Sequence, residues 1–122
     1  MKEINSRYNF KNGEPITPVR YLESVFHSYV GLESPKCTMM KECGSYVVVE
    51  HNAIVYSCDF FVEPRHRLGN IRQGRIIDML NSKKQDEFGK AKTLLTRKYK
   101  FCPWYQKCFG GCIKDRIKDP DD

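Results

Sequence analysis

The residues best suited to chemistry in this sequence are its cysteines. There are six in 122 residues, about 5%, which is below the ~8–10% typical of small disulfide-stabilised proteins. They form two groups, with spacings C-x5-C-x14-C and C-x5-C-x3-C: Cys37, Cys43 and Cys58, then Cys102, Cys108 and Cys112. Thiolates are the ligands that soft iron and zinc sites select, and four of them complete a tetrahedral zinc site or a cubane iron–sulfur cluster. The cysteines therefore predict metal binding rather than a disulfide framework.

The first cysteine group brackets a predicted β-hairpin over residues 44–57. The stretches 44–50 and 53–57 are rich in β-branched and aromatic residues, which favour strands. His51-Asn52 lies between them as the predicted turn, although Ala53 stands where a left-handed turn position would prefer glycine. Gly69-Asn70 predicts a further turn.

Helices are predicted on both sides of the hairpin. The first covers residues 17–30, begins near Thr17-Pro18 and has an apolar face that we expect to pack against the core: Val19, Leu22, Phe26, Tyr29 and Val30. Two more helices are predicted over about 74–81 and 83–98, and Ser82 with Gln85 resembles a capping box at the start of the second. The fold class that follows is a small α+β domain tied by a metal site.

The composition is that of one globular domain, which we expect over residues 17–117, between a flexible arm (1–16) and an acidic tail (118–122). Hydrophobic residues make up 40% and charged residues 30%. No apolar run approaches the ~20 residues of a membrane span, and the first residues do not resemble a signal peptide, so we expect a cytoplasmic protein without membrane contact. The net charge of +6 admits a nucleic-acid partner, but the basic residues are dispersed, which favours a solvated surface.

Two stretches of the sequence carry a family resemblance. They are CGSYVVVEHNAIVYSCDFFVEPRHRLGNI (Cys43–Ile71) and CPWYQKCFGGCIKDR (Cys102–Arg116). With the Cys-Asp step, the VEP and LGNI segments and the GGC-x-x-DR ending in this order, the chain resembles the C-terminal SPASM region of anaerobic sulfatase-maturating enzymes over about residues 35–117. The resemblance implies auxiliary 4Fe-4S clusters beside the substrate of a separate radical S-adenosylmethionine barrel. It also implies two partners, that barrel and a sulfatase-type polypeptide whose Cys or Ser is oxidised to formylglycine.

The resemblance further implies which cysteines belong to which cluster. One cluster falls to a complete set of four: Cys37, Cys43, Cys58 and Cys112. The second requires C-x2-C-x5-C and a later cysteine. Cys102 and Cys108 match two of its positions, whereas Tyr99 stands at the first, and the last would lie beyond Asp122. We therefore expect one complete 4Fe-4S site and one incomplete site.

The radical barrel's own motif, CX3CX2C, does not occur in this sequence. In the family, its three cysteines hold the cluster that binds S-adenosylmethionine through a free iron. Without it we expect this chain alone to make no deoxyadenosyl radical and to be catalytically inactive. An electron-transfer or substrate-docking role is the expectation that remains.

Asp59 is the candidate catalytic residue. Successive strand residues point to opposite faces, so Cys58 can face a cluster while Asp59 faces a substrate cavity. The resemblance implies that this carboxylate accepts the proton of the substrate thiol or hydroxyl, a role suited to a partly desolvated group with a raised pKa. The alternative is that Asp59 caps a turn or pairs with Arg65 or Arg67.

Other functions remain open at the level of the residues. Zinc could take the same four thiolates as a structural site. The chain could also be a metal-free protein-interaction domain with a Cys102–Cys108 disulfide. A nucleic-acid-binding function would be supported only by the positive net charge.

The histidines and the second cysteine group's aromatic residues add little to these alternatives. None of His27, His51 and His66 has zinc-finger spacing, and we expect surface roles for His27 and His51. Trp104 and Tyr105 could shield a metal from water, but packing in the core is the simpler expectation.

Overall fold

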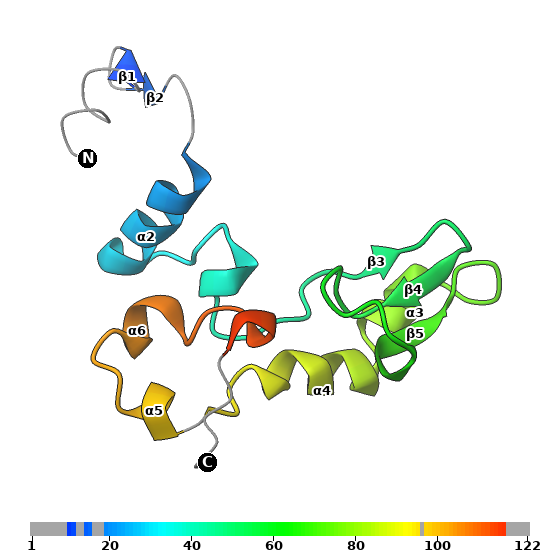
Figure 1. The fold of residues 1–122 in the computed structure, drawn as a ribbon. Helices are drawn as coiled ribbons and strands as arrows, with labels where there is room; N and C mark the ends of the chain where they lie inside the picture. The colour runs from blue at the N-terminus through cyan, green and yellow to red at the C-terminus, as the bar shows by residue number, and fades with distance from the viewer. Residues whose placement is uncertain (1–9, 12–13, 16–18, 96, 117–122) are drawn as a thin grey trace.

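The computed structural model describes residues 10–11, 14–15, 19–95 and 97–116 (Figure 1). In chain order its helices and strands are β1 (Phe10–Lys11), β2 (Glu14–Pro15), α2 (Arg20–Val30), β3 (Val48–Val49), β4 (Ile54–Tyr56), β5 (Arg67–Asn70), α3 (Ile76–Leu80), α4 (Lys83–Ala91), α5 (Arg97–Lys100) and α6 (Tyr105–Cys108). Three 3-10 turns join them: η1 (Cys37–Met39), η2 (Pro64–His66) and η3 (Ile113–Asp115). Figure 1 shows α4 extending from the three-stranded sheet toward α5 and α6.

This arrangement confirms the predicted α+β class. In the predicted arm, β1 and β2 pair antiparallel, and the other residues of 1–16 lie outside the described residues, as does the predicted tail 118–122. None of the described helices is long and apolar enough to cross a membrane.

The sheet contains the predicted hairpin, with strands shorter than the predicted 44–50 and 53–57, and one strand that was not predicted. The strands are antiparallel in the order β3-β4-β5, with Val55 of β4 opposite both Val49 and Gly69. The prediction of a turn at Gly69-Asn70 is wrong, because both residues belong to β5. A Cβ at Gly69 would lie 2.8 Å from the flexible terminal methyl of Met79 in α3, which would have to shift to admit a larger side chain.

The hairpin turn forms at His51-Asn52, as predicted. The Ala53 N–H donates to the Glu50 carbonyl (2.8 Å), and the Glu50 N–H donates to the Ile54 carbonyl (2.9 Å). Ala53 adopts the left-handed conformation (φ 67°) that glycine would fill more easily, at a cost of roughly 1–2 kcal/mol. Its methyl group is buried, at 7% exposure, and this burial offsets part of that cost.

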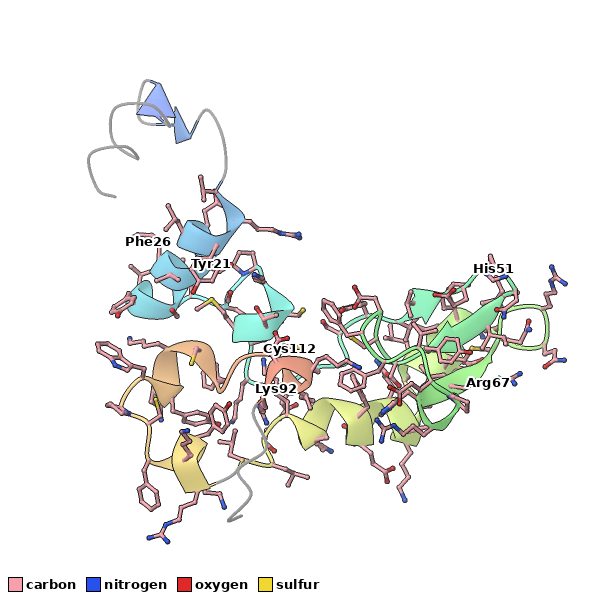
Figure 2. All side chains as sticks on the ribbon, in the orientation of Figure 1. Tyr21, Phe26, His51, Arg67, Lys92 and Cys112 are labelled. Atoms are coloured by element: carbon pink, nitrogen blue, oxygen red, sulfur yellow. The ribbon has the colours of Figure 1, made fainter. Side chains whose placement is uncertain are left out.

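Helix α2 ends as predicted but packs through another face. The predicted start at Thr17-Pro18 lies outside the described residues, and Val19 is not helical. Gly31 ends the helix with φ 77°. The apolar face that we expected in the core is mostly exposed, with Phe26 at 62% (labelled in Figure 2). The helix packs against α6 and η1, and the fully buried residue of α2 is Ser24, whose small side chain allows close approach.

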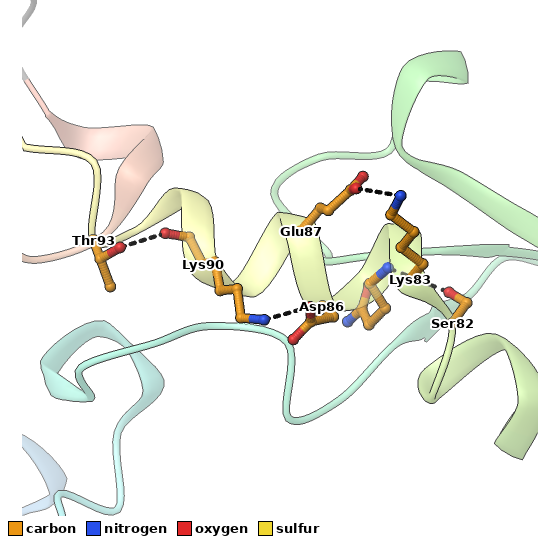
Figure 3. Close-up of polar contacts among 7 residues, drawn as sticks. Ser82, Lys83, Asp86, Glu87, Lys90 and Thr93 are labelled. Carbon is orange, nitrogen blue, oxygen red and sulfur yellow. Dashed lines mark hydrogen bonds and ion pairs between the residues drawn. The ribbon is translucent and has the colours of Figure 1, made fainter.

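Helix α4 begins with the predicted cap, since the Ser82 hydroxyl accepts a hydrogen bond from the Gln85 N–H (3.2 Å). Its exposed side carries ion pairs between residues four apart, drawn in Figure 3: Lys83–Glu87 and Lys90–Asp86. The predicted extent to residue 98 is wrong, because α4 ends at Ala91 and α5 is a separate short helix.

Side-chain hydrogen bonds to the backbone accompany the early end of α4. The Arg116 guanidinium donates to the carbonyls of Lys92 (2.6 Å) and Leu94 (3.2 Å). The Thr93 hydroxyl donates to the Lys90 carbonyl (2.8 Å). These donors satisfy carbonyls at the helix end, so the chain can turn away there.

The buried apolar core is small. Among the described residues its members are Ala53, Val55, Phe61 and Phe88. The Phe61, Phe88 and His66 rings meet edge to face, with centroids 5.0–5.5 Å apart. The expectation that Trp104 packs in the core is wrong, since it is 62% exposed, whereas Tyr105 packs edge-on against Phe109.

Gln85 links α4 to both sides of the hairpin. Its side-chain amide nitrogen lies within hydrogen-bond distance of the carbonyls of Gly44 (3.2 Å), Tyr46 (2.9 Å) and Ser57 (3.2 Å), which share its two N–H groups. The side chain is almost fully buried, so these carbonyls have little access to water. Gln85 thus fixes the segments just after Cys43 and just before Cys58.

Replacing Gly89 with alanine should displace the Cys43 segment. A Cβ at this position would lie 2.5 Å from the Cys43 carbonyl oxygen, which belongs to rigid backbone. We expect Gly89→Ala to destabilise the domain by about 1–3 kcal/mol in thermal unfolding. Gly74→Ala is the matched control, because its nearest contact is the flexible Met79 methyl at 3.3 Å. Equal melting temperatures for the two variants would contradict the close approach.

Replacing Gln85 with methionine should loosen the hairpin from α4. The change keeps the shape but leaves the buried Ser57 carbonyl and two partly buried carbonyls without their donor, at a cost of about 2 kcal/mol in urea unfolding. Gln73→Met, on an exposed turn, should change stability by less than about 0.5 kcal/mol. If the two variants unfold at the same urea concentration, Gln85 does not have this role.

Candidate metal centre

Four of the six cysteines line one cavity. They come from four separate segments of the chain: Cys37, Cys43, Cys58 and Cys112. Its walls are largely aromatic and aliphatic, with Phe60, Phe61, Phe88 and Ile113 among the lining residues. Each of the four thiols is half-buried, and all six cysteines are free, so the alternative Cys102–Cys108 disulfide is not formed.

The other candidate ligands lie away from this cavity. Cys102 and Cys108 are not among its lining residues, and the Cys108 thiol donates instead to the Trp104 carbonyl (3.7 Å). His51 is exposed at the hairpin turn, as expected, and His27 binds the Glu33 carbonyl through Nδ1 (2.9 Å). In the described part of the chain, no three His, Cys, Asp or Glu side chains, the four cavity cysteines included, are arranged so as to hold a single metal ion.

Lys92 anchors the segment that carries Cys37. Its side chain is fully buried, at 0% exposure, and its ammonium donates to the carbonyls of Cys37 (2.9 Å), Thr38 (3.1 Å) and Met40. Figure 2 shows Lys92 and Cys112 together near the centre of the molecule. Burial lowers the pKa of Lys92, and the nearby Cys43 thiol acts in the opposite direction.

Arg116 anchors the segment that leads into Cys112. Besides the carbonyls at the end of α4, its guanidinium donates to those of Gly110 (3.2 Å) and Phe109 (3.3 Å). Gly110 and Gly111 both have left-handed backbone (φ 76° and 68°), which glycine adopts without strain. The glycine pair and Arg116 together set the path of the chain into the fourth cysteine.

The surroundings of the thiols favour their protonated form. Burial raises the pKa of the Cys43 thiol, and the positive charge of Lys92 partly opposes this. Burial also raises the pKa of the Cys58 thiol, against a hydrogen bond with the Tyr46 hydroxyl, whose oxygen lies 3.5 Å from Sγ. Because a metal binds thiolates, metal binding at these cysteines would release protons.

Asp59 is not placed as we expected. Strand β4 ends at Tyr56, so Cys58 and Asp59 do not alternate across a sheet, and the Cys58 thiol donates to Asp59 Oδ1 (3.2 Å). The Tyr46 hydroxyl also donates to Oδ1 (2.9 Å). These two hydrogen bonds lower the pKa of the Asp59 carboxyl, which corrects the expected increase. Among the described residues, no ion pair joins Asp59 to Arg65 or Arg67, and Arg65 pairs with Glu63 (2.8 Å).

Sequence reasoning missed the polar residues that hold the site together, namely Lys92, Gln85 and Tyr46. A lysine near a helix end is normally exposed, so nothing in the sequence marked Lys92 as buried. Gln85 was identified only as part of the capping box. Arg116 lies within the GGC-x-x-DR ending, which is the signal that could have identified it.

Comparison with known proteins places this geometry in a family. Residues 37–112 match the family described as "SPASM: Iron-sulfur cluster-binding domain". The chain is 36% identical over 105 residues to a serine-type anaerobic sulfatase-maturating enzyme of Bacteroides thetaiotaomicron, covering 85% of this chain and 25% of that protein. It is 32% identical over 113 residues to a cysteine-type enzyme of Clostridium perfringens, covering 93% and 30%.

Solved structures give the same result. The structure described as "Native anSMEcpe with bound AdoMet and Cp18Cys peptide" is similar with a TM-score of 0.72 and 32% identity, over 84% of this chain and 28% of that one. The chain thus spans about a quarter to a third of the length of the relatives that it matches. The family match begins at Cys37 and ends at Cys112, two of the four cysteines that line the cavity, and on this match the chain belongs to the SPASM family of iron–sulfur cluster-binding domains.

Proposed function

We propose that this domain binds one 4Fe-4S cluster through Cys37, Cys43, Cys58 and Cys112 and serves as the auxiliary iron–sulfur domain of a sulfatase-maturating system. The observation that carries the proposal is that these four thiols, and neither of the other two, line one cavity. Four cysteine thiolates are the usual ligand set of a 4Fe-4S cluster. Such a cluster would supply one-electron transfer when bound.

The chain's own residues fit this role in chemical type. The thiols supply soft ligands, and Phe60, Phe61 and Phe88 form an apolar wall that limits the access of water. Lys92 and Gln85 hold the segments on which Cys37, Cys43 and Cys58 lie. Tyr46 fixes the Asp59 carboxylate beside Cys58 through its 2.9 Å hydrogen bond.

A second cluster is not part of the proposal. Tyr99, which the resemblance places at the first ligand position of the second site, lies in α5 with its ring 5.8 Å from the Arg116 guanidinium carbon. A phenol ring held in this way supplies no thiolate. Cys102 and Cys108 are then two ligands of four, which is too few for a stable cubane.

The partners proposed for the domain are a radical S-adenosylmethionine barrel and a sulfatase-type polypeptide. This rests on relatives that are sulfatase-maturating enzymes and on solved structures with AdoMet and a peptide. In such an assembly the Asp59 carboxylate, which is exposed beside the cysteine cavity, is the candidate acceptor of a substrate proton. The domain itself would carry electrons or dock the polypeptide.

Anaerobic reconstitution with iron and sulfide should give about four iron atoms per chain rather than eight, because the chain offers one complete set of thiolates. Cys58→Ser should lose most of this iron. Cys102→Ser and Cys108→Ser, outside the cavity, are the matched controls and should retain it. Iron and zinc are measured by elemental analysis, with Mössbauer spectroscopy for cluster type. Eight irons, zinc in place of iron, or full iron in Cys58→Ser would each contradict the proposal.

Incubating the iron-loaded chain with S-adenosylmethionine and dithionite should yield no 5′-deoxyadenosine above background. The reason is that the sequence lacks the CX3CX2C motif whose cluster leaves an iron free for this cofactor. The product is measured by chromatography, with a complete sulfatase-maturating enzyme as the positive control. Stoichiometric cleavage by this chain alone would show that it has radical chemistry of its own.

A further inference from the structure

Lys92 is an unusual residue for the position that it occupies. It is the largest fully buried side chain among the described residues, and it lies where α4 ends. Lysine is almost never fully buried unless it is paired. Within the part of the chain that the structure describes, no carboxylate forms an ion pair with it.

The hydrogen bonds of Lys92 match the donor geometry of an ammonium. The three acceptors of its Nζ are all backbone carbonyls: Cys37, Thr38 and Met40. An ammonium has three N–H groups, one for each of these carbonyls. The geometry therefore fits a buried positive charge.

The negative partner of this charge is best sought in the cysteine cavity. Carbonyl dipoles solvate an ammonium in part, but a buried charge without a counter-ion remains costly. Electrostatic interaction with Cys43, Cys37 and Cys112, three of the four cysteines that line the cavity, raises the pKa of Lys92 against the effect of its burial. Arg116 is the other positive group that acts on Lys92, and its own donors are used on backbone carbonyls.

We infer that Lys92 is the charge-compensating residue of the cysteine site, and that its ammonium stabilises the thiolate-ligated cluster and makes that cluster easier to reduce. The inference rests on the proposed function. A cluster bound by four thiolates is negatively charged and gains one more negative charge when one electron reduces it. A fixed positive charge nearby stabilises the reduced form more than the oxidised form. Lys92 does not line the cavity, so this is a positioning and electrostatic role rather than ligation.

The test compares midpoint potentials in the reconstituted chain. Dithionite supplies one electron per cluster, and the reduced form is followed by electron paramagnetic resonance. In Lys92→Met we expect the equilibrium to shift about tenfold toward the oxidised cluster, equivalent to about 59 mV for a one-electron couple. Lys90→Met is the matched control on the same helix, because Lys90 is exposed and paired with Asp86, and its potential should equal that of the unchanged chain. An unchanged potential in iron-loaded Lys92→Met would overturn the inference.

A second comparison covers the case in which Lys92→Met retains no cluster. Lys92→Arg keeps the positive charge and Lys92→Gln removes it, and the readout is iron per chain after reconstitution. Retention in the arginine variant with loss in the glutamine variant supports the role of charge. Equal loss in both would overturn it, since the effect would then follow from packing. Absence of iron from the unchanged chain would overturn the proposed function itself, whereas normal iron loading with equal potentials would overturn the inference about Lys92 alone.

Discussion

The hydrogen bonds from the Lys92 ammonium to the 37–40 segment are the interaction on which the cysteine site depends most. Few apolar residues are buried in the described chain, so the long segments between the short strands and helices cannot be fixed by apolar packing alone. Polar side chains take this role: Lys92 holds the segment of Cys37, Gln85 those of Cys43 and Cys58, and Arg116 that of Cys112. Each contributes on the order of 1 kcal/mol per hydrogen bond, but losing a buried donor costs more, because the carbonyls that it satisfied are partly shielded from water.

Three of the four cysteine segments share one support. The proposed ligands lie on segments distant in the sequence, and α4 contacts three of these segments through Gln85, Gly89 and the residue that follows the helix, Lys92. The absence of a side chain at Gly89 lets the Cys43 backbone lie directly on the helix, where its N–H donates to the Gly89 carbonyl (3.2 Å). Movement of α4 would therefore be transmitted to three of the four thiols.

Features that depend on local sequence could be predicted, and features that depend on long-range contacts could not. The hairpin follows from β-branched residues around His51-Asn52, and the cap of α4 from the spacing of Ser82 and Gln85. By contrast, Gly69-Asn70 forms a strand because both residues pair with β4. At the end of α4 the Lys92 carbonyl is bonded by Arg116, more than twenty residues away, and the exposed face of α2 cannot be foreseen from its periodicity. The grouping of four cysteines came from a family resemblance, since their spacing alone is compatible with several pairings.

Asp59 depends on both local sequence and long-range contacts. Its place after Cys58 can be read from the sequence, but its environment depends on Tyr46. Tyr46 precedes the hairpin and Asp59 follows it, and the folded hairpin places the Tyr46 hydroxyl 2.9 Å from the Asp59 carboxylate. The Tyr46 hydroxyl also lies 3.5 Å from the Cys58 thiol, so one phenol contacts both a proposed ligand and the proposed proton acceptor. The main chain at Tyr46 is held in turn by Gln85, through the Tyr46 carbonyl. The helix that supports the cysteine segments thus also sets the position of the carboxylate. A displacement of α4 would therefore move both the thiols and the carboxylate.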